Sequence, residues 1–315
     1  MTTPRVSIGV PVYNGERYVA KALDILLAQT FQDYEIIISD NGSSDGTARI
    51  CQEYLARDRR ISYIRYEHTV SPVGNFCRTA AHARGEYFTW TAFDDVRPLD
   101  AIERCVAALD AHPACVMAHG PVIADCIRKG TTVFIEHRMD LARADVRARI
   151  GTFTREMLYN GMLYGVYRLE SLRKAIFTQH PGHDYLLPLQ MCLLGPIAYT
   201  PSTMLIYQHV WGETDTPMYK LEPVTLRDLV LYRGIRRRKC WLTLVLGSAY
   251  LMRMGDVPIT DRLAGTMEHV NGFVRRYRHH LASELLFLAS TPMSWACAPL
   301  APAGRRLKRA LAGVD

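Results

Sequence analysis

The sequence predicts an α/β fold with a mostly parallel sheet flanked by helices, followed by a helical C-terminal extension. Strand and helix patterns alternate over the first 118 residues, which is typical of repeated strand–helix–strand units. The run Ile36-Ile37-Ile38 is continuously apolar, as expected of a central strand buried on both faces. Beyond Leu226 the apolar spacing indicates helices only.

Each element of the first part follows from its own pattern. Alternating apolar residues predict a strand at 6–12, and helical spacing predicts a helix at 19–27. The next strand stops at the turn-rich segment 39–46, and a helix through Leu55 follows. The remaining elements expected in this part are a strand at 61–66, a helix at 75–83, a strand at 87–90, a helix at 99–109 and a strand at 115–118.

The pattern is looser in the middle of the chain. Between residues 120 and 148 only 131–135 predicts a strand, and residues 157–173 look helix-rich. The expected elements that follow are an apolar helix at 185–194 and short strands at 197–199 and 204–207. We therefore divide the chain into a domain at 1–220, with halves at 1–118 and 119–220, and a basic helical region at 221–315.

Composition narrows the class of protein. Eight cysteines are scattered without a Cys-x-x-Cys pair, so neither a zinc site nor a redox pair is predicted. Spread cysteines in apolar surroundings, with no signal sequence ahead of the first strand, lead us to expect a cytoplasmic protein. The net charge is +7; Leu226 to Asp315 holds fifteen Lys and Arg against six Asp and Glu, which is +9, and the rest of the chain is −2.

Asp94 and Asp95 directly follow a predicted buried strand. Adjacent carboxylates repel and raise each other's pKa, and a hard divalent cation such as Mg²⁺ or Mn²⁺ relieves that repulsion. The alternative is that the pair only ends the strand and caps a helix at Pro98. Both readings stay open at this point.

Asp40 and Asn41 also lie at the end of a predicted strand. Ligands of parallel sheets bind outside the carboxyl ends of the strands, and these side chains could pair with a nucleobase or a ribose hydroxyl. The alternative is an Asx turn that caps the next helix. A Gly-rich phosphate loop is absent after the first strand, which argues against a dinucleotide oxidoreductase, a P-loop enzyme and a nucleotidyltransferase.

Four segments together resemble glycosyltransferase family 2, in the usual order and spacing. They are Val6-Ser-Ile-Gly-Val-Pro-Val-Tyr-Asn14, Leu27-Ala-Gln-Thr-Phe31, Glu35-Ile-Ile-Ile-Ser-Asp-Asn-Gly-Ser-Ser-Asp-Gly-Thr47 and Ala83-Arg-Gly-Glu-Tyr87, with Asp94-Asp95 after the last. The resemblance is strong over residues 5–109, thinner to 211 and absent beyond. It implies a GT-A fold, a nucleotide-sugar-binding half at 1–118, an acceptor-binding half at 119–220, and inverting transfer of a sugar from a nucleotide-diphosphate donor.

The resemblance also implies roles for individual residues. The positions that match nucleotide-sugar-binding positions of the family are Pro11, Tyr13, Asn14, Asp40, Asn41, Asp94 and His209. Asp95, with Asp94, matches the metal-binding acids, so Mn²⁺ or Mg²⁺ is the expected cofactor. Two positions depart from the family: Asn41 stands where an Asp that pairs with uracil is common, and Ala92 stands at the first acid of the Asp-x-Asp-Asp form. The Asn41 departure weakens the assignment of the base, but an amide could still pair with a pyrimidine; UDP-sugars stay the favoured donors, with dTDP- and GDP-sugars as options.

Inverting transfer needs a general base for the acceptor hydroxyl. The family carries this acid in a Glu-Asp-like pair at the start of a helix, and His183-Asp184 resembles that pair, so Asp184 is the candidate base. The alternative is that Asp184 only caps the helix. Sequence departures at Ala92 and Asn41 keep a second function open, a catalytically degenerate nucleotide-sugar-binding or scaffold protein of a glycan assembly complex.

The basic C-terminal region suggests where in the cell the protein acts. Arg and Lys clusters flank apolar, Trp-bearing segments that are too short to span a bilayer, which suits the anionic inner face of a membrane. A helical subdomain packed on the catalytic domain is the alternative. Nucleic acid is not an expected partner because no nucleic-acid-binding motif accompanies the charge. Glycans, lipid-linked saccharides and similar hydroxyl compounds are the expected acceptors.

Overall fold

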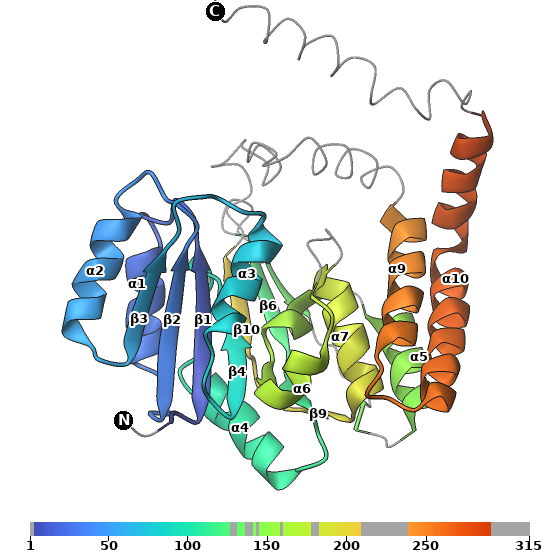
Figure 1. Ribbon diagram of the computed structural model, residues 1–315, viewed down its shortest axis with the longest axis horizontal. Helices are drawn as coiled ribbons and strands as arrows, with labels where there is room; N and C mark the ends of the chain where they lie inside the picture. The colour runs from blue at the N-terminus through green and yellow to red at the C-terminus, as the bar shows by residue number, and fades with distance from the viewer. Residues whose placement is uncertain are drawn as a thin grey trace, which may run out of the picture.

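The computed structural model describes residues 3–126, 131–135, 141–142, 145–157, 160–177, 183–208 and 239–290. Its main feature is a seven-stranded sheet in the order β3-β2-β1-β4-β8-β5-β9, with helices on both faces (Figure 1). The strands are β1 Val6–Val12, β2 Tyr34–Asp40, β3 Ile61–Arg65, β4 Tyr87–Trp90, β8 Val166–Arg168, β5 Met117–His119 and β9 Ile197–Tyr199. The predicted α/β architecture is confirmed.

The sheet is parallel except around β8, which pairs antiparallel with both β4 and β5. The helices that connect its first strands are α1 Val19–Leu27, α2 Thr47–Arg57, α3 Pro72–Ala81 and α4 Ala101–Ala111. Helix α3 packs against β1 and β2, whereas α1 lies behind these strands in Figure 1. Every residue of β1 and β2 is buried, as expected of central strands covered on both sides.

Two strands were missed by the sequence patterns. Residues 157–173 looked helix-rich, but this stretch holds a 3-10 helix at Asn160–Tyr164, then β8, then α6 Leu169–Lys174. Strand β8 has only three residues, and it exists because β4 and β5 pair with it on both sides. Strand β6 Val122–Cys126 was also missed; it forms a second sheet with the predicted β7 Thr131–Ile135 and β10 Leu205–Gln208.

The Ala83-Arg-Gly-Glu-Tyr87 motif stabilises the amino-terminal edge of the sheet. Ser7 Oγ donates to Glu35 Oε1 (2.7 Å) and accepts from the Gly85 N–H (2.8 Å). Arg84 forms an ion pair with the buried Glu35 carboxylate (2.5 Å). A Cβ on Gly85 would lie 2.8 Å from the Ser7 nitrogen, so only glycine fits this close approach. The motif therefore joins β1, β2 and β4 at the edge opposite the candidate site.

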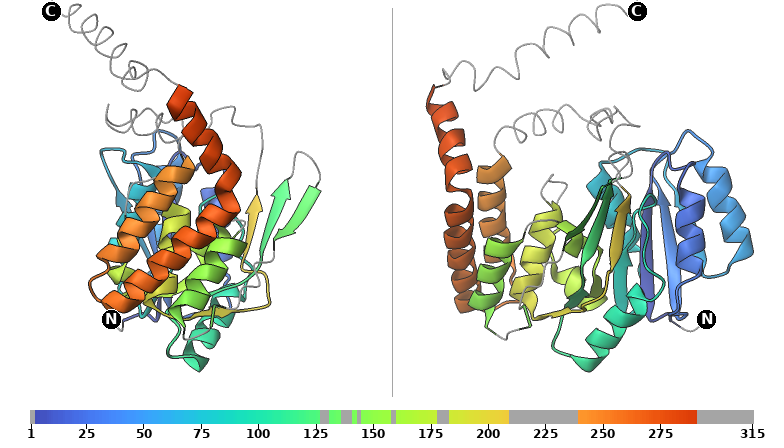
Figure 2. Two further views of the ribbon diagram at one scale, coloured as in Figure 1. Left: turned by 90° about the vertical axis from the view of Figure 1, so that its right-hand side faces the viewer. Right: turned by 180° about the vertical axis from the view of Figure 1, so that it is seen from behind.

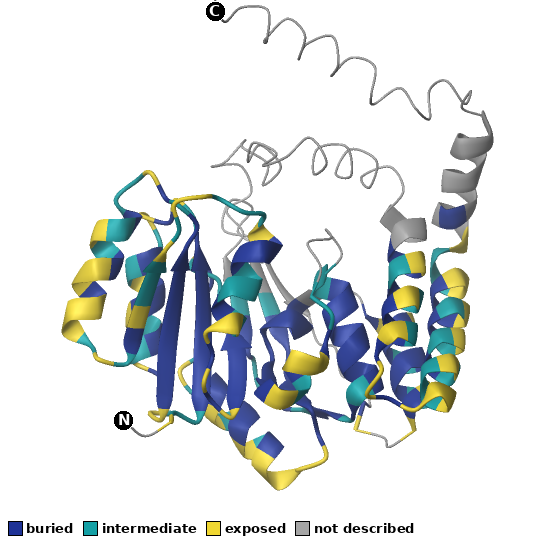
Figure 3. Cartoon of the chain, viewed as in Figure 1, coloured by how far each residue is buried: buried dark blue, intermediate teal, exposed yellow. Residues whose placement is uncertain are grey.

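The C-terminal helices pack on the second half of the domain. Helices α9 Lys239–Arg253 and α10 Ile259–Ser290 lie side by side and contact α5 Val146–Glu156 and α7 His183–Leu194 (Figure 2). Buried rings join these helices: Tyr185 of α7 lies 5.1 Å from Phe153 of α5 and 6.0 Å from Phe273 of α10 between ring centroids. Strands β1, β2 and β4 of the large sheet are buried, whereas the edge strand β3 and the outer face of α10 are partly exposed (Figure 3).

Candidate active site

The carboxyl ends of the parallel strands define one edge of the molecule. Strands β1, β2 and β4 end at Val12, Asp40 and Trp90, and the polar loops follow at this edge. Helix α7 leads through a two-residue connection into β9, which is parallel to β5, so α7 runs back along the sheet. The start of α7, with His183 and Asp184, therefore lies at the same edge as the strand ends (Figure 1).

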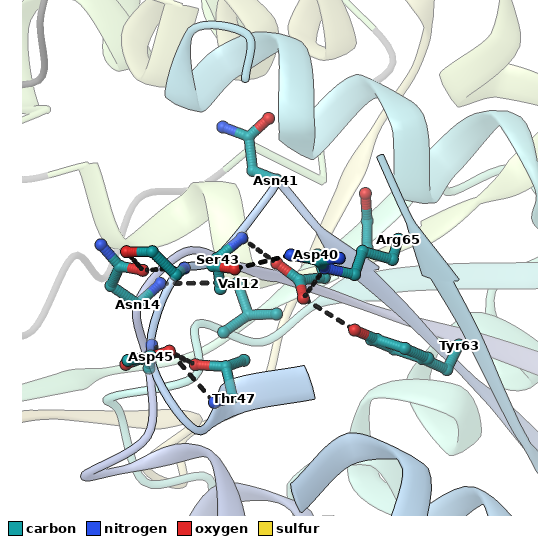
Figure 4. A network of polar contacts seen from close by, with 12 residues as sticks. Val12, Asn14, Asp40, Asn41, Ser43, Asp45, Thr47, Tyr63 and Arg65 are labelled. Carbon is teal, nitrogen blue, oxygen red and sulfur yellow. Dashed lines mark hydrogen bonds and ion pairs between the residues drawn. The ribbon is translucent and has the colours of Figure 1, made fainter. Parts of the chain in front are cut away.

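The loops after β1 and β2 are locked together (Figure 4). They exchange hydrogen bonds from Asn14 N–H to Ser43 Oγ (2.9 Å), Gly15 N–H to Thr47 Oγ1 (2.8 Å), Glu16 N–H to Asp45 Oδ2 (3.0 Å), Ser44 N–H to Asn14 Oδ1 (2.9 Å) and Gly46 N–H to Glu16 Oε2 (3.0 Å). Asn14 has a φ of +48°, which asparagine tolerates better than most residues. These N–H groups are bonded within the protein, so this loop does not form a phosphate-binding nest.

The structure places three nucleotide-site candidates in or beside β1. Pro11 is buried within the strand opposite Ser39 of β2, and Tyr13 follows the strand and is half-buried. Asn14 is exposed at the start of the locked loops. Tyr13 and Asn14 thus lie at the carboxyl edge, whereas Pro11 shapes the strand beneath them.

The Asp40 carboxylate is fully buried and accepts bonds from several groups. The Ser43 N–H donates to Oδ1 (2.8 Å), the Tyr63 hydroxyl donates to Oδ2 (2.7 Å), and the Arg65 guanidinium lies 3.7 Å from Oδ2. Burial and the bond to Asp40 raise the pKa of Tyr63 above its usual range. The Ser43 bond closes a turn three residues after Asp40, but it does not cap α2, which begins at Thr47.

The Asn41 amide is matched to the backbone of the loop before α3. Its Nδ2 donates to Val70 O (2.8 Å), and its Oδ1 accepts from Val70 N–H (2.9 Å) and from Arg78 Nη1 (3.2 Å). Thr69 Oγ1 donates to Asn41 O (3.0 Å). Figure 4 shows the Asn41 side chain directed away from the Asp40 carboxylate. Both polar ends of the amide therefore hold the 66–71 loop in place.

The turn after β4 carries Asp94, which is exposed, and Asp95, which is 8% exposed. The sequence alternative, that the pair caps the next helix, does not hold, because α4 begins at Ala101 with Asp100 as its N-cap residue. Val96 exchanges two backbone hydrogen bonds with Ile206 of β10 (3.0 and 2.8 Å). The acidic turn is thus fixed beside β10.

Buried polar side chains that the sequence did not single out hold this turn from below. Arg97 is fully buried and donates to Trp90 O (2.6 Å), Tyr164 O (3.0 Å) and Thr91 Oγ1 (3.0 Å). Gln29 Nε2 donates to Pro98 O (3.1 Å). The sequence gave no sign that Arg97 is buried. The acceptors Thr91 Oγ1 and Trp90 O lie close to it in the chain, but Tyr164 O comes from a segment that only the fold brings beside it.

Asn75 of α3 was also not predicted. It is buried, its Nδ2 donates to Ser39 O (3.0 Å) and Val12 O (3.3 Å), and its Oδ1 accepts from Ser39 Oγ (2.6 Å). One amide therefore ties the carboxyl ends of β1 and β2 to the helix that covers them.

Asp184 lies in the first turn of α7, and its Oδ1 accepts a hydrogen bond from the neighbouring Tyr185 N–H (3.0 Å). The neighbouring His183 ring meets Phe76 of α3 edge-on, with 6.0 Å between centroids. Burial lowers the pKa of His183, although the Asp184 charge opposes the shift. His209 follows β10 and lies outside the described residues.

The described donors fit a divalent cation only in an open site. Asp94 and Asp95 offer hard oxygen ligands, but no group of three or more His, Cys, Asp and Glu side chains comes together in the described ranges. Mg²⁺ and Mn²⁺ sites of nucleotide enzymes use one or two carboxylates with phosphate oxygens and water. The residues present fit that kind of site and not a closed protein cage.

Comparison with known proteins agrees with the fold and the motifs. Residues 7–162 match the family model "Glycosyl transferase family 2". The chain is 31% identical over 228 residues to chondroitin synthase of Escherichia coli, covering 70% of this chain and 31% of that protein. It spans less than half the length of the first curated relatives it matches.

Two solved structures share the fold. TarS of S. aureus in complex with UDP-GlcNAc has a TM-score of 0.60 at 16% identity, covering 89% of this chain and 79% of TarS. The mannosyltransferase PcManGT of Pyrobaculum calidifontis, in complex with GDP-Man and Mn²⁺, has a TM-score of 0.54 at 18% identity, covering 99% and 81%. With its GT-A architecture and the matched motifs, the chain belongs to glycosyltransferase family 2.

Proposed function

We propose that this protein is an inverting glycosyltransferase that moves a sugar from a nucleotide-diphosphate donor to an acceptor hydroxyl. The observation that carries the proposal is the convergence of the Asp94-Asp95 turn and the start of α7 at the carboxyl edge of one sheet. That edge is where open α/β sheets bind ligands. Family membership supports the same conclusion.

In this mechanism Asp184 takes the proton of the acceptor hydroxyl as the oxygen attacks the anomeric carbon from the face opposite the leaving diphosphate. Asp94 and Asp95 would hold Mg²⁺ or Mn²⁺, which stabilises negative charge on the leaving diphosphate when it is bound. Arg97 keeps the acidic turn in place through its bonds to β4 and Tyr164. Preorganised groups of this kind lower the barrier because they need not rearrange during the reaction.

A UDP-sugar is the favoured donor in this proposal, with dTDP- and GDP-sugars as options. Tyr13 and Asn14 would line the base pocket together with the 66–71 loop that Asn41 holds. TarS and PcManGT, which share the fold, were solved with UDP-GlcNAc and with GDP-Man and Mn²⁺, respectively. The nucleotide is thus a choice among a few candidates that one binding experiment can resolve.

The acceptor is proposed to be a glycan or a lipid-linked saccharide, with the protein at the cytoplasmic face of an anionic membrane. Within the described ranges no helix is both long and apolar enough to cross a bilayer. Helix α10 exposes Ile259, Leu263, Met267 and Val274 and carries exposed Arg275 and Arg278. An exposed apolar stripe beside basic residues supports peripheral binding to such a surface.

The test is calorimetric binding of UDP, dTDP, GDP and CDP, each with Mn²⁺ and with EDTA. Metal-dependent binding of one nucleotide supports the donor site; no binding with metal refutes it. Turnover of the matching sugar nucleotides then separates an enzyme from a catalytically degenerate binding or scaffold protein. Asp184→Asn should abolish turnover and keep nucleotide affinity, whereas a scaffold has no turnover in either form.

A further inference from the structure

His183 has an unusual environment for a polar side chain. Its Nε2 is buried and has no hydrogen-bond partner among the residues that the structure describes. Burial also lowers the pKa of His183, so the ring is neutral near pH 7. A buried polar atom without a partner costs folding free energy, and native proteins keep few of them. A bound ligand is one way to satisfy such an atom.

The position of the ring indicates which ligand. His183 begins α7 at the carboxyl edge of the sheet, next to the candidate base Asp184. Its ring contacts Phe76 of α3, and Phe76 contacts Trp90 of β4 at 6.0 Å between centroids. Helix α3 packs on β1 and β2, in the half that carries the nucleotide-site candidates. The imidazole therefore lies next to the base and against the helix that covers that half.

We infer that His183 Nε2 hydrogen-bonds a hydroxyl group of the donor sugar. A sugar hydroxyl both donates and accepts, so it suits either tautomer of a neutral imidazole. The inference rests on the proposed function, because it needs a nucleotide-sugar at this edge. It assigns to His183 the recognition of the sugar and not of the nucleotide.

The test compares binding of nucleotide sugars with binding of the bare nucleotides. Calorimetry with Mn²⁺ measures Kd for UDP-glucose, UDP-GlcNAc, GDP-mannose and dTDP-glucose, and for UDP, GDP and dTDP. His183→Phe keeps a ring against Phe76 and removes the polar atom. We expect this substitution to weaken binding of the sugar nucleotide by about 3- to 10-fold. It should leave the Kd of the bare nucleotide unchanged and keep or raise Tm. His183→Gln, which can return a polar atom near Nε2, should restore at least half of the loss.

His269 provides a matched control. Its Nε2 is also buried without a partner in the described part of the chain, but it lies on α10 against Tyr185 and Gly247. His269→Phe should leave the Kd of the sugar nucleotide and the Kd of the bare nucleotide unchanged. The inference is overturned if His183→Phe binds sugar nucleotides within two-fold of the wild type, or if His183→Gln is as weak as His183→Phe. If the wild type binds no nucleotide sugar or nucleotide, the proposed function itself fails.

Discussion

Acidification is expected to destabilise this protein through His269. The side chain is fully buried on α10, where its Nδ1 lies 3.5 Å from the Tyr185 hydroxyl. Burial lowers the pKa of His269 from 6.5 to about 4, although a backbone hydrogen bond to Leu244 opposes the shift. Tyr185 directly follows Asp184, so protonation of His269 would disturb the packing that supports the candidate base.

The magnitude follows from the two pKa values. Between pH 6.5 and 4 the unfolded chain binds a proton on this residue that the folded protein does not, so stability is complete above pH 6.5 and falls as pH decreases. The full loss is about 3 kcal/mol at pH 4 and below, and about 1.2 kcal/mol of it appears between pH 7 and 5.5. His183, whose pKa is also lowered, acts in the same direction.

The assay is urea unfolding of the wild type and His269→Phe at pH 7 and pH 5.5, monitored by tryptophan fluorescence. Any packing change in the variant affects both pH values alike, so the difference in pH dependence isolates the titration of His269. The wild type should lose about 1.2 kcal/mol more than the variant over this interval. If both proteins lose the same stability, the burial of a neutral His269 is refuted.

Three further predictions concern the acidic turn and the α10 surface. Asp95→Asn should weaken Mn²⁺-dependent nucleotide binding about ten-fold without changing binding in EDTA; an unchanged Mn²⁺ titration in calorimetry would contradict this. Arg97→Met should lower the free energy of unfolding by about 2–4 kcal/mol in urea, because buried Trp90 and Tyr164 carbonyls lose a charged donor; a loss below about 1 kcal/mol would contradict it. Leu263→Glu with Met267→Glu should reduce co-sedimentation with phosphatidylserine vesicles about five-fold or more at unchanged nucleotide affinity; equal sedimentation would refute membrane docking through α10.

Strands with a strong local pattern were predictable from the sequence. Strand β1 was placed at its observed bounds, 6–12, because alternating apolar residues and a following turn mark it, and β4 was placed at its observed bounds, 87–90. Strand β8 was not predictable, since its three residues gain their conformation from antiparallel pairing with β4 and β5. The fold class could therefore be predicted without β8, but the order of the strands in the sheet could not be predicted from the apolar pattern of the sequence.

Some residues of the candidate site were predictable from the sequence and others were not. The sequence placed Asp40 and the Asp94-Asp95 pair at strand ends, and the structure has them there. It gave no sign of Asn75 or Arg97, because their partners lie on other strands and helices and only the folded chain brings them together. The catalytic role of Asp184 and the metal-binding role of Asp95 stay predictions.

The environment of Asn41 bears on whether the site has degenerated. The family commonly has an aspartate here, but a carboxylate would place an oxygen 2.8 Å from the Val70 carbonyl oxygen, where the Asn41 amide donates instead. The same amide accepts from the Val70 N–H, so both of its ends match the loop that it holds. The departure at Asn41 is therefore explained by the loop that the amide holds, and it is not by itself a sign that the site has decayed.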